Sequence, residues 1–336
     1  MLFRSIEWDF CERQSSRFDH YHEVLKNLKS KNKIYPCYET KSELDLKRKK
    51  QLNMGNPPIY DRTALKLTPE DHKKFDDEGK KAHWRFLLDK KKICWNDKII
   101  GDVSIDLESL SDPVFVKEDG QFLYTLASVC DDIDFCITHV IRGSDHLTNT
   151  ATQIQLIQDL GSEVPIYGHH SLLIDTTGDN LSKRFGSLSI REIRNSGIEP
   201  MALINLMSSL GSSNSPKLLH SLDEVFEFFD ISSFGSSPTK FDVKLLNSIS
   251  AKLLRATPFY LVENELINIG VPKSALKDFW EVIKENLNSR DEIPKLWDLC
   301  TNGISPVIDK EDLEFVKIAL EVLPKAPYNK DSWKIW

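Results

Sequence analysis

The spacing of apolar side chains predicts two helices near the start of the chain. Within residues 15–30 the apolar positions recur at intervals of three and four, which places them on one face of a helix. The Tyr35-Pro36 step ends this pattern. Thr40 followed by Glu43 then forms a capping box, which predicts that a second helix begins there.

Short apolar runs separated by turns replace the helical pattern from Trp84 to Val140. Such runs occur at residues 84–88, 98–102 and 113–116, and they are typical of strands. Asp119-Gly120 has hairpin-turn chemistry between the runs at 114–116 and 122–124. We therefore expect a β-rich stretch here, followed by a helix near residues 126–129.

The next pattern indicates a parallel α/β sheet. Residues 137–141 are predicted to form a buried strand, residues 149–160 a helix and residues 172–174 another strand. A strand, a helix and a strand in that order are typical of a parallel unit.

Beyond Ser187 the strand pattern disappears and the chain is predicted to be helical. Pro200 occupies the first turn of a helix that Gly211 ends, and residues 211–216 form a plausible hinge. Further helices are predicted by their apolar spacing, near residues 221–229, 242–256, 273–287 and 309–323.

Composition favours an ordinary globular protein of one large or two medium domains. The chain has 336 residues, of which 40% are hydrophobic and 28% charged. No apolar run approaches the roughly 20 residues that a bilayer span needs, so we expect no membrane segment. The six cysteines have no repeated spacing, and the first ten residues lack a signal-peptide core, so we expect reduced thiols in a cytoplasmic protein.

Charge is unevenly distributed along an acidic chain of formal net charge −7. Between Lys26 and Lys50 there are nine basic and three acidic residues. This local excess could follow a phosphate backbone, or it could be the solvated face of a helix. Charge alone favours the solvated face.

Two segments carry the candidate chemistry. The first includes Thr138-His-Val-Ile-Arg-Gly-Ser-Asp-His146, and the second includes Leu181-Ser-Lys-Arg184. They resemble the THVIRGxDH signature and the KMSKS-type loop of glutamyl-tRNA synthetases, a family of class I aminoacyl-tRNA synthetases. Residues 187–201 resemble the junction to the family's anticodon-binding domain, in a form typical of α-proteobacterial members.

The resemblance implies an ATP site that includes a catalytic lysine, Lys183. When the carboxylate of an amino acid attacks the α-phosphorus of ATP, a mobile lysine can stabilise the departing pyrophosphate. Without the resemblance, a Lys-Arg pair after a turn is ordinary surface charge. The residues implied at the ATP site are Asp145, Leu172, Leu173, Leu181, Ser182, Lys183 and Arg184.

Arg142 is the candidate for capturing a carboxylate. It follows an apolar strand and precedes a glycine, so it lies at the carboxyl end of a strand, where α/β sheets bind ligands. The resemblance assigns Tyr124 and Arg142 to the glutamate substrate. The alternative is an internal ion pair with Asp131 or Asp132. His169-His170 suggests a metal site, but the better interpretation is a pair of ordinary buried or surface histidines.

The resemblance also implies the architecture. We expect an incomplete Rossmann-type α/β catalytic domain at residues 1–189, with an inserted acceptor-stem-binding region at about 38–121. An α-helical anticodon-binding domain would occupy residues 190–336. Some family members hold zinc with a Cys-x-Cys pair, but here Glu39 stands where the second cysteine would be, so we predict no zinc.

The implied function is that of a glutamate–tRNA ligase. Its substrates would be ATP with Mg²⁺, L-glutamate and tRNA(Glu). The protein would be a monomer and would not bind a membrane. The family's HIGH-type motif has no counterpart here, and the family pattern is cut at both ends. We therefore expect marginal stability and little or no aminoacylation activity from this chain alone. The open alternatives are an inactive tRNA-binding remnant, one half of a split synthetase that needs a separate N-terminal fragment, and an unfolded relic.

Overall fold

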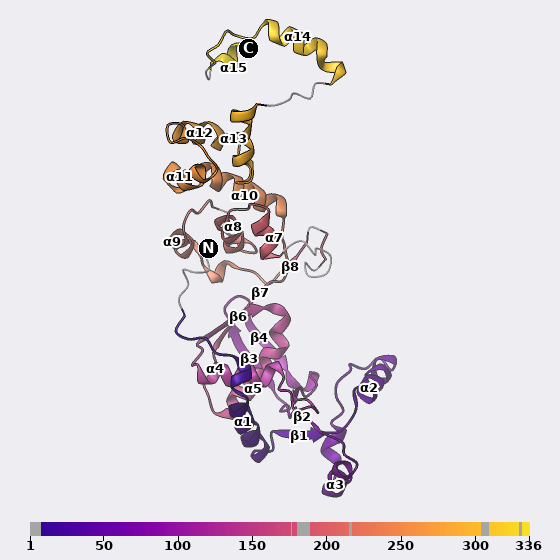
Figure 1. Ribbon diagram of the computed structural model, residues 1–336. Coiled ribbons are helices and arrows are strands. Elements are labelled where there is room, and N and C mark those ends of the chain that lie inside the picture. Colours follow the sequence, from indigo (N-terminus) through magenta and orange to yellow (C-terminus); the bar gives the residue numbers. More distant parts are fainter. Residues whose placement is uncertain (1–7, 176, 180–188, 215–216, 304–308, 329–330) are drawn as a thin grey trace. The chain divides into compact units, whose positions relative to one another are not determined.

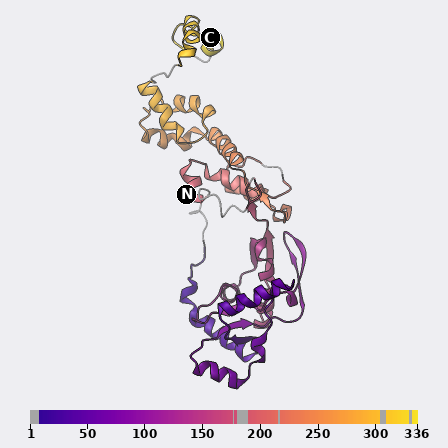
Figure 2. The ribbon, with the colours of Figure 1, turned by 90° about the vertical axis from the view of Figure 1, so that its right-hand side faces the viewer.

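The computed structural model describes residues 8–175, 177–179, 189–214, 217–303, 309–328 and 331–336. The chain divides into two compact units, Met1–Ile249 and Ser250–Trp336. Figures 1 and 2 trace both units in perpendicular views. We describe each unit by itself.

A parallel βαβ unit forms the part of the first unit that carries the candidate site. Strand β6 (His139–Gly143) pairs in parallel with β7 (Ile166–His170), and helix α5 (Leu147–Leu160) connects them. The predicted parallel arrangement is therefore confirmed, but its second strand is β7 and not the run at 172–174. β6 was predicted to be buried and is not: Ile141 is 45% exposed. Among the described strands β6 pairs only with β7, which leaves its other edge uncovered there.

Three helices build the main hydrophobic core beside these strands. Helix α1 (Phe18–Ser30), helix α4 (Tyr124–Asp134) and α5 contribute the fully buried side chains of Tyr21, Leu126 and Leu156. The helices predicted from apolar spacing at 15–30 and 149–160 are confirmed. The predicted helix at 126–129 is confirmed as part of the longer α4.

An antiparallel sheet and a separate hairpin lie between α1 and α4 in the sequence. The sheet has the order β1 (Ile34–Cys37), β2 (His83–Phe86) and β5 (Val114–Val116). After β5, the expected hairpin is reduced to a single bridge between Val116 and Phe122, because Tyr124 already begins α4.

The hairpin consists of β3 (Lys92–Asp97) and β4 (Gly101–Asp106). The run at 98–102 was predicted to be a strand, but residues 98–100 are the turn between β3 and β4. The carboxylate of Asp97 accepts hydrogen bonds from the Ile99 and Ile100 amides, both at 3.1 Å. Gly101 supplies the positive φ of 86° that ends the turn.

Two capped helices, α2 (Lys41–Asn53) and α3 (Pro69–Asp77), lie between β1 and β2 in the sequence. The capping box of Thr40 and Glu43 is present as predicted. Thr68 and Asp71 form a second box, with Pro69 at the first helical position. Short 3₁₀ helices occur throughout the described chain: η2 (Gln14–Ser16), η3 (Thr63–Lys66), η4 (Leu107–Ser109), η5 (Ser144–His146), η6 (Ile231–Ser233), η7 (Lys284–Asn286) and η8 (Lys310–Asp312).

The remainder of the first unit is mainly helical. It contains α7 (Ile190–Asn195), α8 (Pro200–Ser209) and α9 (Leu222–Phe228). The prediction that no strand follows Ser187 is wrong, because β9 (Thr239–Lys240) pairs in parallel with β8 (Leu173–Ile174). A two-residue strand is too short for any periodicity to reveal.

The regular elements described within the second unit are all helical. They are α10 (Val243–Ala256), which begins before the boundary between the units, α11 (Phe259–Asn268), α12 (Leu276–Ile283), α13 (Glu292–Asn302), α14 (Leu313–Glu321) and α15 (Ser332–Ile335). Leu254, Leu266, Trp280 and Ile293 are fully buried in its core. The sequence did not predict α11 or α13. No helix in the described ranges is long and apolar enough to cross a membrane.

Candidate functional site

The candidate site lies at the carboxyl end of β6, where the sequence placed Arg142. Gly143 ends the strand, and η5 leads directly into α5, whose first turns face the strand end. Tyr124 is the first residue of α4 and is half exposed. Ligands of parallel α/β sheets bind at this end of the strands.

The guanidinium of Arg142 is held by three neutral oxygens. Its Nη1 donates to the Tyr124 hydroxyl at 2.9 Å. Its Nη2 donates to Thr150 Oγ1 at 2.5 Å and to Gln153 Oε1 at 2.6 Å. The structure therefore brings together Arg142 and Tyr124, the two residues predicted for glutamate, and adds two polar side chains of α5.

The alternative of an internal ion pair for Arg142 is not what the structure shows. Asp131 instead accepts from Arg17 Nε at 2.7 Å. Burial raises the pKa of Asp132, and the positive charge of nearby Arg142 only partly offsets this. Within the described ranges no carboxylate reaches Arg142, and its buried Nε has no hydrogen-bond partner.

A buried polar pair lies beneath the guanidinium. The side chains of His169 and Asp97 are both fully buried, with His169 Nδ1 2.5 Å from Asp97 Oδ2. His169 Nε2 is 2.8 Å from Thr150 Oγ1, the same oxygen that accepts from Arg142. The ring of Tyr167 stacks on His169 and lies 5.5 Å from the Arg142 guanidinium carbon. His169 is thus an ordinary buried histidine, whereas His170 is exposed.

Gly143 allows two of the predicted ATP residues to approach the strand end closely. A Cβ at this position would meet Asp145 Oδ1 at 2.6 Å and Leu172 Cδ2 at 3.2 Å. Asp145 is exposed, and Leu173 follows Leu172 in β8. Asp145 and Leu172 therefore lie at the same strand end as Arg142.

The loop that resembles the KMSKS motif falls outside the described residues. Leu181, Ser182, Lys183 and Arg184 belong to it. The roles of these four residues at the ATP site therefore stay predictions.

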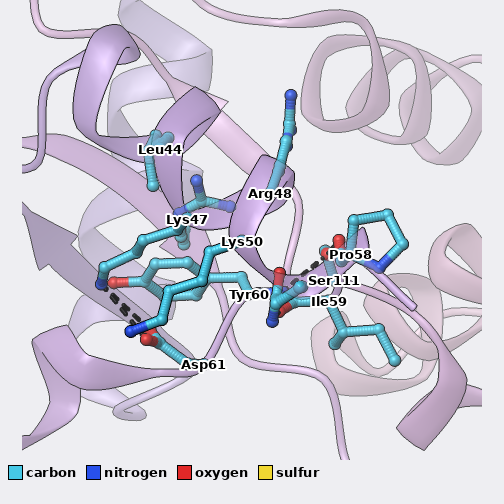
Figure 3. A pocket seen from close by; sticks show the side chains of 11 residues that line it. Leu44, Lys47, Arg48, Lys50, Pro58, Ile59, Tyr60, Asp61 and Ser111 are labelled. Carbon is cyan, nitrogen blue, oxygen red and sulfur yellow. Dashed lines mark hydrogen bonds and ion pairs between the residues drawn. The ribbon is translucent and has the colours of Figure 1, made fainter. Parts of the chain in front are cut away.

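A second polar site lies between α2 and the segment that follows it. A cavity of about 250 Å³ is lined by Lys47, Arg48 and Lys50 of α2 and by Tyr60 and Asp61 of the following segment. Figure 3 shows these side chains. The ammonium group of Lys47 is 3.2 Å from an Asp61 carboxylate oxygen and 3.0 Å from one of Glu39. The cavity wall is therefore basic, but one of its lysines is already paired.

The residues at the family's zinc position do not fit a zinc ion. Burial raises the pKa of the Cys37 thiol to about 11, and its sulfur lies 3.7 Å from the Tyr60 hydroxyl. Glu39 accepts from Lys47, Tyr60 and Thr63, so an ammonium group occupies the place where a cation would bind. In the part of the chain that the structure describes, no three metal-ligating side chains cluster.

Part of the basic excess at 26–50 is used inside the protein. The ammonium group of Lys29 lies 3.4 Å from the centroid of the Trp84 ring, and Lys33 pairs with Asp159 at 2.8 Å. The four basic residues of α2 other than Lys47 are exposed: Lys41, Arg48, Lys49 and Lys50. Any contact with a phosphate backbone would therefore come from α2 more than from α1.

Sequence reasoning missed Thr150, Gln153 and Asp97, and it did not connect His169 with Arg142. A signal for the first two is present, because α5 buries an unusual set of polar residues: Thr150, Thr152, Gln153 and Gln155 are each at most 6% exposed. Buried polar side chains need partners, so these residues indicate a site once the structure shows that they are buried. No local pattern identifies Asp97, because its partner His169 is 72 residues away in the sequence.

Comparison with known proteins gives a consistent result. Residues 2–248 match the model of the catalytic domain of class I tRNA synthetases (E and Q). Glutamate–tRNA ligase 1 of Paracoccus denitrificans is 48% identical over 328 residues, which cover 98% of this chain and 74% of that protein. Glutamate–tRNA ligase 2 of Jannaschia sp. is 48% identical over 336 residues, or 100% of this chain and 75% of that protein.

A solved structure has the same fold. The crystal structure of a glutamate tRNA ligase from Elizabethkingia meningosepticum, in complex with its amino acid, matches with a TM-score of 0.80 at 24% identity. The match covers 95% of this chain and 71% of that one.

Proposed function

The chain belongs to the class I tRNA synthetases of glutamate and glutamine, among the glutamate–tRNA ligases, and we propose that it binds glutamate at Arg142 for ATP-dependent transfer to tRNA(Glu). The first step joins the glutamate α-carboxylate to the α-phosphorus of ATP and releases pyrophosphate. The second transfers the glutamyl group to the 3′ end of the tRNA and releases AMP.

The observation that carries this proposal is the state of the Arg142 guanidinium. It is held in place by Tyr124, Thr150 and Gln153, none of which neutralises it. A guanidinium held by neutral oxygens keeps its charge for a substrate carboxylate, with which it can form charge-assisted hydrogen bonds. Arg142 and Tyr124 would thus be the glutamate-binding pair.

The residues proposed for ATP are chosen by their resemblance to the family and by their place near the same strand end. We assign Asp145, Leu172 and Leu173 to the nucleotide, with Asp145 accepting from its ribose. The loop of Leu181, Ser182, Lys183 and Arg184 would close over the phosphates. Lys183 would stabilise the negative charge that develops on the leaving pyrophosphate, with Mg²⁺ accompanying ATP as part of the substrate.

The proposed domain roles follow the family. Residues 1–189 would form the Rossmann-type catalytic part, and the insertion at about 38–121 would contact the acceptor stem. Residues 190–336 would form the helical anticodon-binding part. The antiparallel sheet and α2, which interrupt the chain before the βαβ unit, are consistent with an insertion, and the helices after Ser189 with the anticodon-binding part.

Glutamate-dependent exchange of pyrophosphate into ATP tests the proposal. The purified chain is assayed with tRNA(Glu), with and without L-glutamate, beside Arg142→Gln and the surface variant Asp77→Asn. A ligase gives exchange that requires glutamate, is lost in Arg142→Gln and is kept in Asp77→Asn. Such turnover would contradict the expectation that this chain is inactive alone. Exchange that survives in Arg142→Gln would refute the role of Arg142.

A second candidate, tRNA binding without catalysis, is favoured by the exposed basic side chains of α2. Lys41, Lys49 and Lys50 are exposed on one short helix. Salt-sensitive binding of tRNA(Glu) with no exchange would support this function. Charge reversal at Lys49 and Lys50 would then weaken tRNA binding without changing glutamate binding.

A further inference from the structure

We propose that Asp97, His169 and Thr150 form a one-way hydrogen-bond relay that positions the Arg142 guanidinium for a substrate carboxylate. The inference deepens the proposed function, since it explains how the glutamate-binding group is oriented without being neutralised. None of the three side chains needs to touch the substrate. They are positioning residues.

The relay is continuous in the structure. Arg142 Nη2 donates to Thr150 Oγ1 at 2.5 Å, and Thr150 Oγ1 lies 2.8 Å from His169 Nε2. His169 Nδ1 lies 2.5 Å from Asp97 Oδ2. The contacts thus run without a break from the guanidinium through the single hydroxyl oxygen of Thr150 and the two ring nitrogens of His169, and they end on a carboxylate.

The direction of each hydrogen bond follows from the two ends. A guanidinium can only donate, and a carboxylate can only accept. The Asp97 carboxylate therefore requires the proton of His169 on Nδ1, which leaves a lone pair on Nε2. The Thr150 hydroxyl has two acceptors within reach, the His169 Nε2 lone pair at 2.8 Å and the His146 carbonyl at 3.2 Å. In the relay it donates to the nearer one, Nε2, and accepts from Arg142. Every group then donates toward Asp97.

Burial favours the single protonation state of His169 that this arrangement requires. His169 and Asp97 are both enclosed, and burial lowers the pKa of His169, which favours the neutral ring. The carboxylate itself is well supported. Besides the His169 ring, Asp97 accepts from the His169 amide at 3.0 Å and from the Ile99 and Ile100 amides at 3.1 Å.

The relay separates negative charge from the guanidinium that it supports. A carboxylate in direct contact with Arg142 would pair with it and compete with the substrate. Placed behind a histidine and a threonine, the charge of Asp97 polarises the hydrogen bonds toward itself. Arg142 is thus oriented firmly and remains cationic. Asp97 belongs to the β3–β4 hairpin, so the hairpin becomes part of the glutamate site from a distance.

The protonation state of His169 gives a test that needs no substrate. In the full chain labelled with ¹⁵N at its nine histidines, the ring signals of His169 are assigned by their loss in His169→Gln. We expect a neutral ring with the proton on Nδ1 at pH 7. In Asp97→Asn the three backbone amides that bind Oδ1 keep the carboxamide oxygen at that position, so the carboxamide nitrogen faces Nδ1 and donates to it. The ring proton should therefore move to Nε2. A wild-type ring protonated on Nε2, or on both nitrogens, would overturn the relay.

Glutamate binding gives the second test, by calorimetry with L-glutamate and, separately, with ATP. Thr150→Val keeps the shape and removes the hydroxyl, and Thr150→Ser restores it. We expect Thr150→Val and Asp97→Asn to weaken glutamate binding about 10-fold or more, the effect of losing one hydrogen bond to a charged group. Thr150→Ser and the neighbouring control His170→Gln should stay within about 2-fold of the wild type.

The two tests separate the relay from the function on which it rests. ATP binding should be unchanged in every variant, because the relay acts only on Arg142. Equal losses for ATP and glutamate in Thr150→Val would show general disruption and refute the positioning role. A wild-type protein with the expected tautomer that fails to bind glutamate would refute the proposed function and leave the relay standing.

Discussion

Replacement of Asp112 gives a sharp test of how the antiparallel sheet is held together. The Asp112 side chain is 0% exposed and its carboxylate accepts three hydrogen bonds. The donors are the Tyr35 hydroxyl at 2.5 Å, Arg62 Nη2 at 2.8 Å and the Leu88 amide at 3.0 Å. Burial raises the pKa of Tyr35, so its hydroxyl keeps the proton that it donates.

The cost of Asp112→Ala follows from the donors that it leaves behind. The Tyr35 and Leu88 residues are 6% and 1% exposed, so water cannot replace the carboxylate for them. Each buried donor without a partner costs about 1–3 kcal/mol, whereas Arg62 is partly exposed and can turn to water. We expect the free energy of opening to fall by about 3–5 kcal/mol, as for other broken buried ion pairs.

Asp112→Asn separates the charge from the shape. The carboxamide oxygen can still accept from Arg62 and from the Leu88 amide, but the nitrogen faces the Tyr35 hydroxyl and can only donate to it. The hydroxyl proton then loses its acceptor. We expect a loss of about 1–2 kcal/mol, between the wild type and Asp112→Ala.

The assay is native-state hydrogen exchange of the amides of β1 and β2 in the full chain. Exchange reports local opening, which suits a protein of two units, for which a single unfolding free energy is not defined. Asp77→Asn, an exposed acid at the end of α3, should change protection by no more than about 0.5 kcal/mol. A loss below about 1 kcal/mol in Asp112→Ala would show that the carboxylate does not hold the sheet.

Three further results are expected. Leu156→Ala removes a fully buried side chain and should lower the free energy of opening of α5, measured by hydrogen exchange of its amides, by about 2–5 kcal/mol. Leu46→Ala, at a position 69% exposed, should lower it by less than about 0.5 kcal/mol. Gly143→Ala should fold normally but weaken ATP binding in calorimetry, because the new Cβ would displace the Asp145 carboxylate. Burial alone would raise the pKa of Glu39, but hydrogen bonds from its neighbours lower it below 4.5. The ionised Glu39 carboxylate therefore stabilises the fold fully above pH 4.5, and this stabilisation is lost as the pH falls through the lowered pKa. Stability measured during acid titration of Glu39→Gln should lack that loss.

Local rules predicted the elements whose signals are local. The capping box of Thr40 and Glu43 begins α2, and Pro200 begins α8, because a helix end is decided by a few neighbouring residues. The apolar residues within 15–30 predicted α1, because side chains three and four positions apart lie on one face of a helix.

Elements that depend on distant partners were missed. β7 reads Ile166-Tyr-Gly-His-His170, which has little apolar character, and it is a strand because β6 and the β3–β4 turn bind its backbone. The Lys98 amide donates to the Tyr167 carbonyl at 2.9 Å, and the Asp97 carboxylate accepts from the His169 amide. Residues far apart in the sequence thus decide the strand, and no window of residues contains that information.

The candidate site divides in the same way. Arg142 was found because a charged residue between an apolar strand and a glycine is a local pattern. The structure places it in contact with Tyr124, and the binding of glutamate by the two stays a prediction. Thr150 and Gln153 contact Arg142 from one face of α5, and they are recognised by their burial, which only the structure shows. Asp97 could not, since a turn aspartate usually caps only its own turn.

The arginines of this chain show why the partners of a guanidinium matter more than its position near the sheet. Arg17 binds two carboxylates, those of Asp131 and Asp134, and Arg62 binds Asp112, so both are neutralised and serve the fold. Arg85 also has neutral partners, since it donates to a backbone carbonyl and lies over the Tyr60 ring. It differs from Arg142 because it is only 5% exposed and lies in an antiparallel strand. Arg142 combines neutral partners with the carboxyl end of a parallel strand. A cation that is oriented, left charged and placed where parallel sheets bind ligands is the arrangement that a carboxylate substrate requires.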